Sequence, residues 1–157
     1  MIYIPDTASD EDILQVVQGW VKLWAELGPE AASSAIAVDE NDPWTPEWLE
    51  YAITNYRPLG LYPDAPLFVL TAPDSATITG HVPTREVKRY DPKNSGLVCD
   101  VCFDLPLNGR WSDLLAEFDL WGGDASDENY LLTLSQIRCW DQFWAEEEKA
   151  LEQREAK

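Results

Sequence analysis

The sequence of 157 residues is poor in basic residues and contains no long apolar run. Eleven lysines and arginines stand against 29 aspartates and glutamates, which gives a formal net charge of -18 at pH 7. This shortage of positive charge argues against direct binding to nucleic acid, because the phosphates would be repelled. No run approaches the roughly 18 apolar residues that a membrane-spanning helix needs, so we expect no membrane segment.

Signals for catalysis and for metal binding are also scarce. No nucleophile elbow, phosphate-binding loop or Ser-His-Asp order occurs, and a lone histidine such as His81 is more often structural than catalytic. The three cysteines are an odd number, which argues against a disulfide framework. Cys99 and Cys102 form a Cys-x-x-Cys motif, but residues three apart on an expected strand point to opposite faces. We therefore expect ordinary thiols, no metal and no cofactor.

Length and composition favour a single domain over residues 1–157. Apolar residues make up 45% and aromatic residues 11%, including eight tryptophans, so the chain can bury a core. The first residues show neither the basic region nor the apolar run of a signal peptide. We therefore expect a cytoplasmic protein.

Three helices are expected within residues 1–57. Ser9 is a predicted N-cap before an acidic first turn, and apolar residues then recur at helical spacing as far as Leu27. A short alanine-rich helix is expected over 30–38. Thr45 and the proline after it mark the start of a third helix over 47–55. The side chains expected to face inward from this helix are Trp48, Leu49, Ala52 and Ile53.

Residues 66–140 predict an antiparallel sheet. Short strands are expected at 67–71 and 77–82, and long ones at 97–105, 111–121 and 130–140, where apolar and polar residues alternate. Asn108-Gly109 is the expected hairpin connection, and a change of phase near Ser135-Gln136 indicates a bulge.

Helices followed by a meander predict an α+β fold, with the N-terminal helices packed on a curved antiparallel sheet. The nuclear-transport-factor-2-like cone is the common fold closest to this arrangement. A charged C-terminal helix is expected over 141–157.

The two clearest strands carry acidic and aromatic side chains on the faces turned away from the expected core. Hairpin pairing would place these side chains next to one another, where carboxylates attract a basic partner and tryptophans anchor it. A plain solvated sheet face is the alternative. The basic residues clustered at 85–93 are expected to act as an internal counter-charge. The expected partner-binding residues are Asp100, Asp104, Trp111, Asp113, Glu117, Asp119 and Trp121.

The segment Leu105–Leu114, of sequence LPLNGRWSDL, is followed by Phe118 and by Leu134–Cys139, of sequence LSQIRC. Together they resemble a small bacterial domain of unknown function that carries an LPLxGxWSDL strand motif. Such domains are found among immunity proteins that are encoded beside polymorphic toxins of contact-dependent, Rhs or type VI secretion systems. The resemblance covers roughly residues 95–140 and implies an immunity protein that neutralises a cognate toxin domain. The acidic charge of the chain favours a basic toxin domain. It implies no functional residues.

Two other functions stay open. A small cone-fold enzyme would use a buried carboxylate as a general base, with or without His81, and requires a deep pocket and a raised carboxylate pKa. An adaptor or scaffold protein would use the expected terminal helix over 141–157.

Overall fold

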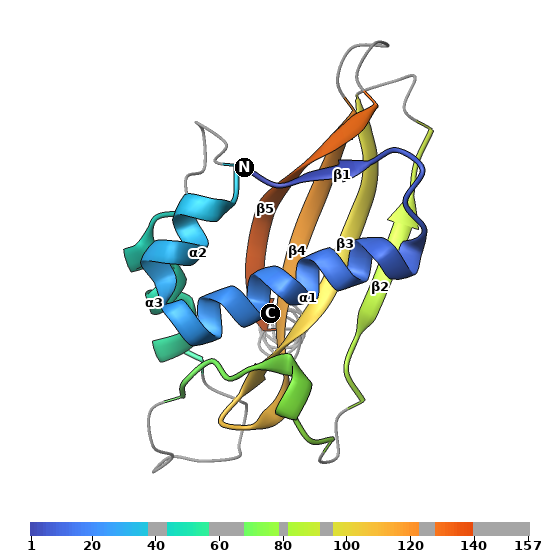
Figure 1. Ribbon diagram of the computed structural model, residues 1–157. Helices are drawn as coiled ribbons and strands as arrows, with labels where there is room; N and C mark the ends of the chain where they lie inside the picture. The colour runs from blue at the N-terminus through green and yellow to red at the C-terminus, as the bar shows by residue number, and fades with distance from the viewer. Residues whose placement is uncertain (38–43, 57–67, 79–81, 92–95, 123–127, 140–157) are drawn as a thin grey trace, which may run out of the picture.

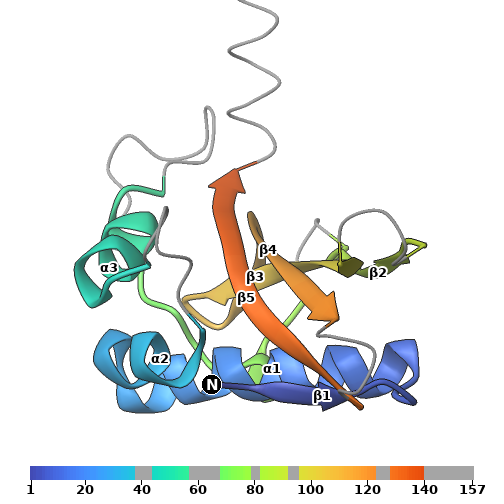
Figure 2. The same ribbon diagram turned by 90° about the horizontal axis from the view of Figure 1, so that it is seen from above.

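The computed structural model describes residues 1–37, 44–56, 68–78, 82–91, 96–122 and 128–139. Within these ranges, three α-helices accompany a curled, five-stranded antiparallel sheet, which is the predicted α+β arrangement. One helix crosses the concave face of the sheet, and the other two lie beside it (Figures 1 and 2). The nuclear-transport-factor-2-like cone stays a prediction, and the expected helix over 141–157 lies outside the described residues.

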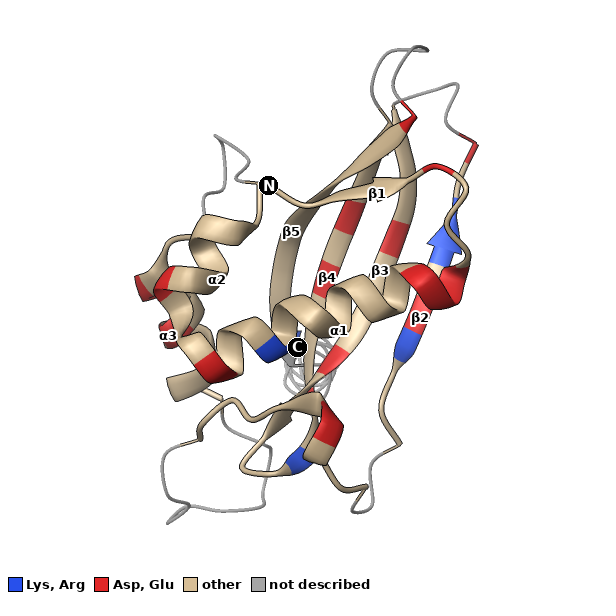
Figure 3. Ribbon diagram, viewed as in Figure 1, with Lys and Arg blue, Asp and Glu red and all other residues tan. Residues whose placement is uncertain are grey.

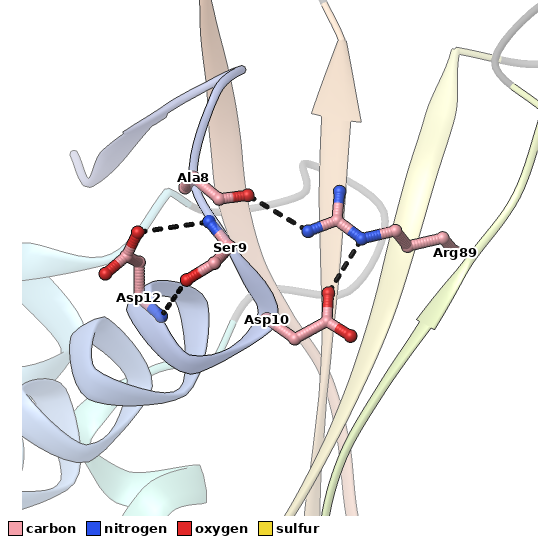
Figure 4. A network of polar contacts seen from close by, with 5 residues as sticks. All are labelled: Ala8, Ser9, Asp10, Asp12 and Arg89. Carbon is pink, nitrogen blue, oxygen red and sulfur yellow. Dashed lines mark hydrogen bonds and ion pairs between the residues drawn. The ribbon is translucent and has the colours of Figure 1, made fainter.

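The longest helix, α1 (Asp10–Leu27), begins and ends where the sequence predicts. The Ser9 hydroxyl accepts a hydrogen bond from the Asp12 N–H, and the Asp12 carboxylate accepts one from the Ser9 N–H, both at 3.1 Å (Figure 4). This reciprocal capping satisfies two backbone donors that a helix start leaves without partners. Gly28 ends the helix at a φ of 95°, which favours glycine. The shorter helix α2 (Pro29–Ala35) follows at once.

The third helix, α3 (Pro46–Thr54), also starts at its predicted cap, because the Thr45 hydroxyl accepts a hydrogen bond from the Trp48 N–H at 3.2 Å. Leu49 and Ile53 are buried as expected. The prediction that Trp48 faces inward is wrong, since its side chain is exposed. Leu49 and Ile53 are four residues apart and set the buried stripe, and Trp48 lies outside it.

The sheet has the strand order β1-β5-β4-β3-β2, with all neighbours antiparallel. The strands are β1 (Tyr3–Pro5), β2 (Arg85–Arg89), β3 (Leu97–Leu107), β4 (Arg110–Gly122) and β5 (Asn129–Cys139). The three long strands confirm the predicted meander.

Two local features of the meander are also confirmed. Asn108 and Gly109 have φ values of 52° and 79°, as the two-residue turn between β3 and β4 requires. The pairing of β4 with β5 shifts by one residue at Ser135, where the bulge was predicted.

The edges of the sheet differ from the prediction. In the described parts of 67–71 and 77–82, only single bridges form, from Leu70 to Leu107 and from Thr77 to Arg110. The edge strands are instead β1 and β2, which the pattern does not reveal. Strand β1 has only three residues and four of the five residues of β2 are charged, so neither shows the alternation of apolar residues that identifies the central strands.

Side chains of α1 fill the concave face of the sheet. The Trp20 ring meets the Phe118 ring edge to face at 5.5 Å between centroids, and Trp24 lies 5.4 Å from Trp20 on the helix side. The Trp20 indole also donates a hydrogen bond to the Ala32 carbonyl at 3.0 Å. The hydrophobic core therefore joins α1, α2 and the sheet.

Basic residues of β2 fasten the start of α1 to the sheet edge. The Arg89 guanidinium forms an ion pair with Asp10 at 2.7 Å and donates to the Ala8 carbonyl at 3.0 Å (Figure 4). The guanidinium of Arg85 lies over the Phe103 ring, 5.3 Å from its centroid. Arg89 thus has the counter-charge role expected for this cluster.

Candidate functional site

The face of β3 and β4 turned away from α1 brings three carboxylates together. Asp100 in β3 is the direct cross-strand partner of Asp119 in β4, and Glu117 lies two residues from Asp119 on the same face. The acidic positions of the two strands lie close to one another (Figure 3). We call Asp100, Glu117, Asp119 and the nearby Trp121 the outer-face cluster. It contains four of the seven predicted binding residues.

The side chains of Asp100 and Asp119 lie directly opposite each other on the two paired strands. Burial and the neighbouring carboxyl groups of Asp100 and Glu117 raise the pKa of Asp119 to about 7. Two facing carboxylates rarely ionise together, because the second charge repels the first. Asp119 therefore keeps its proton to a higher pH than an ordinary aspartate.

Tyr90 and Lys88 border the pair on the side of β2. The Tyr90 hydroxyl donates a hydrogen bond to Asp100 at 2.5 Å. This bond and burial raise the pKa of Tyr90 to about 12. The Lys88 ammonium lies over the Tyr90 ring, 5.3 Å from its centroid. Asp100 is thus held in place by Tyr90, the residue directly after β2.

Glu117 is held by residues of β5. The Arg138 guanidinium forms an ion pair with its carboxylate at 2.6 Å, and the Gln136 amide donates a second hydrogen bond. The Glu117 side chain is only 17% exposed, so solvent screens this pair less than an open surface pair. Much of the negative charge at Glu117 is therefore compensated within the fold.

Trp121 marks the end of the outer-face cluster. Its indole N–H donates to the Thr133 hydroxyl at 3.0 Å, and its side chain is 37% exposed. A large aromatic side chain beside carboxylates is typical of an anchor at a protein interface.

Three of the predicted residues are buried, so the expectation that they lie on an exposed face is wrong. Asp104 is fully buried, and its carboxylate accepts a hydrogen bond from the Thr84 N–H at 2.6 Å. Trp111 belongs to the core, where its ring meets the Phe103 ring edge to face at 5.8 Å. Asp113 is buried as well and accepts a hydrogen bond from the Tyr56 hydroxyl.

The reason lies in the hairpin end formed by β3 and β4. The register of the two strands is interrupted between Asp104 and Pro106, so regular alternation does not extend to Trp111. Residues 68–78 also run along this end, with hydrogen bonds from the Thr71 N–H to the Pro106 carbonyl and from the Trp111 N–H to the Thr77 carbonyl. A neighbouring segment thus covers what an isolated hairpin would expose.

A second acidic and aromatic group, which the sequence reasoning missed, lies on α3. Trp48 and Tyr51 are each 57% exposed, with ring centroids 5.6 Å apart. Glu47 and Glu50 are exposed next to them. The spacing of the buried residues in α3 could have identified this face, because it leaves positions 48 and 51 outside the apolar stripe.

The structure describes the side chains of Cys99 and Cys102. Cys99 is buried and Cys102 half-buried, and both are free. Burial and the nearby charges of Glu117, Glu86 and Asp100 raise the pKa of Cys102 to about 11. No group of three or more metal-ligating side chains occurs among the described residues. His81 lies outside them.

Comparison of the chain with protein-family models, curated proteins and solved structures finds no match. None of the described helices is both long and apolar enough to cross a membrane.

Proposed function

We propose that this protein is an immunity protein that binds a basic bacterial toxin domain and blocks its active site. The observation that carries the proposal is the outer-face cluster, in which Asp100, Glu117 and Asp119 gather beside Trp121. The net charge of -18 and the resemblance over residues 95–140 support the same kind of partner. In this proposal, binding takes place in the cytoplasm and requires neither catalysis nor a cofactor.

Electrostatics favours such a partner. An excess of negative charge speeds the encounter with a basic surface. The hydrogen bonds to Asp100 and Glu117 already order these side chains, which reduces the entropy lost on binding. A toxin that acts on a polyanion, such as a nuclease, has a basic active site, and carboxylates can occupy the places where phosphates would lie.

The proposal is tested by purifying this protein together with the product of the adjacent upstream gene. We expect a complex whose affinity falls as salt rises, and we expect cells that produce both proteins to grow when cells with the neighbour alone do not. Absence of both the complex and the protection would reject the proposal.

The outer-face cluster is tested by the double variant Asp100→Asn/Asp119→Asn. It keeps the shapes of both side chains and should weaken the complex about tenfold or more, because charged pairs at interfaces are worth several kcal/mol when broken. The matched control is Glu11→Gln/Glu128→Gln, which removes two exposed carboxylates from other elements. Equal weakening by both variants would mean that total charge, and not the outer-face cluster, determines binding.

A further inference from the structure

Among the described residues, the exposed side of α3 forms a compact surface whose side chains lie outside the hydrophobic core. We define the α3 surface as Glu47, Trp48, Glu50 and Tyr51, all exposed. The Trp48 and Tyr51 rings meet edge to face, with an interplanar angle of 73°. The helix is held by its cap and by the buried Leu49 and Ile53, not by these two rings.

Two neighbouring aromatic side chains that are more than half exposed need an explanation. Leaving a tryptophan in water forgoes the favourable transfer that burial gives, about 25 cal/mol per Å² of apolar surface. Rigid aromatic side chains are enriched at the centres of protein interfaces, where they lose little conformational entropy on binding. The Trp48–Tyr51 pair therefore points to a protein partner.

The charges around the pair specify the partner's chemistry. Helices α2 and α3 contain Glu30, Glu47 and Glu50 and no lysine or arginine, and Figure 3 shows only acidic positions on them. Across the described ranges of the chain, neither Glu47 nor Glu50 has an ion pair or a side-chain hydrogen bond. In this respect they differ from Glu117, whose charge Arg138 already compensates.

We propose that the α3 surface is a docking site for a basic protein segment that presents an arginine side chain. The guanidinium plane stacks on the Trp48 ring, and its N–H groups donate to the carboxylate of Glu47 or Glu50. Arginine fits better than lysine, because its planar fork stacks on an aromatic ring and donates to a carboxylate at the same time. The inference goes beyond the proposed function, since it concerns another surface and does not require a toxin as the partner.

The test uses the full chain labelled with 5-fluorotryptophan and fluorine NMR, with the Trp48→Phe variant to assign the Trp48 resonance. The probe is a blocked alanine-based peptide with arginine at every fourth position. We expect it to shift the Trp48 resonance, whereas the same peptide with neutral citrulline in place of arginine leaves it unchanged. Trp48→Ala should raise the Kd for the arginine peptide about tenfold, measured by titration calorimetry.

Charge placement is tested with matched double variants. Glu47→Gln/Glu50→Gln should raise the Kd about threefold to tenfold, because it removes two possible ion pairs. Glu11→Gln/Glu128→Gln removes the same formal charge at the start of α1 and before β5, on the far side of the fold (Figure 1), and should change the Kd less than about twofold. The inference is overturned by equal binding of the citrulline peptide, by equal effects of the two double variants, or by a Trp48 resonance that responds only to protein concentration.

Discussion

The outer-face cluster and the α3 surface contain the same kinds of residue, but the fold treats them differently. On the sheet, Asp100, Glu117 and Trp121 all have hydrogen-bond partners within the protein. On α3, Trp48 and Tyr51 contact each other and are mostly open to solvent. The difference follows from geometry: side chains on a central strand have neighbours on both adjoining strands, whereas the outer side of a surface helix has none.

This difference shows that acidity alone does not define a binding surface. Where carboxylates already have partners, as Glu117 has Arg138, a new partner must replace existing interactions or add to them. Where carboxylates have no partner among the described residues, as on α3, their attraction to a cation is not offset by an existing interaction. The outer-face cluster is therefore the ordered surface and the α3 surface the accessible one.

The largest expected loss of stability comes from a substitution in the core, which belongs to neither surface. Trp20→Ala should lower the free energy of unfolding by about 3–5 kcal/mol, because it leaves a cavity against Phe118 and Trp24 and removes the hydrogen bond to Ala32. Urea denaturation followed by circular dichroism measures this loss. A loss near 1 kcal/mol would mean that the concave face is not filled by this side chain.

The next largest loss of stability is expected on the outer-face cluster and not on the α3 surface. Glu117→Ala should lower the free energy of unfolding by about 1.5–3 kcal/mol, since it removes hydrogen bonds to a charged partner that is mostly shielded. Glu50→Ala, the control on α3, should change it little. Equal losses in urea denaturation would contradict the distinction between an ordered and an accessible surface.

A smaller effect is expected at Asp100 and Asp119, where a substitution should increase stability rather than lower it. The pKa of Asp119 is raised to about 7 in the folded protein, so the folded state binds this proton more tightly than the unfolded state. The stabilisation is present at acidic pH, below the unfolded pKa near 4, and is lost as the pH rises through about 7.

Asp119→Asn removes this pH dependence. Above pH 7 it should raise the free energy of unfolding by about 0.2–1 kcal/mol, because it relieves the repulsion between directly opposed carboxylates. The difference between the wild type and the variant, measured by urea denaturation from pH 4 to pH 9, isolates this group from the other carboxylates. A variant that is less stable than the wild type at pH 8 would argue against repulsion between the two opposed carboxylates.

The smallest effect on stability is expected for Trp48→Ala. Because this side chain is 57% exposed and outside the core, the free energy of unfolding should change by about 0.5 kcal/mol or less. The same substitution should have the larger effect on peptide binding described above. A loss of several kcal/mol in thermal or urea denaturation would show that Trp48 supports the fold rather than a partner.

Local signals in the sequence were sufficient to predict the helix starts, the hairpin turn and the bulge of the central elements. Ser9 and Thr45 predicted two helix starts, Asn108-Gly109 the hairpin turn, and the change of phase at Ser135 the bulge. Each of these signals acts through the backbone of a few adjacent residues, so it can be recognised in the sequence without knowing the rest of the structure. The edge strands β1 and β2 had no such signal, because they form by pairing with the meander.

The alternation of residues determined by itself that Asp100, Glu117 and Asp119 share one face of the sheet. Only the tertiary structure decided which acidic and aromatic residues are accessible. Residues 68–78 run along the hairpin end beside Trp111, and Tyr56 reaches the buried Asp113, while the packing of α3 leaves Trp48 outside. Burial depends on which distant segment lies against a side chain, and a pattern of neighbours along one strand or helix does not contain that information.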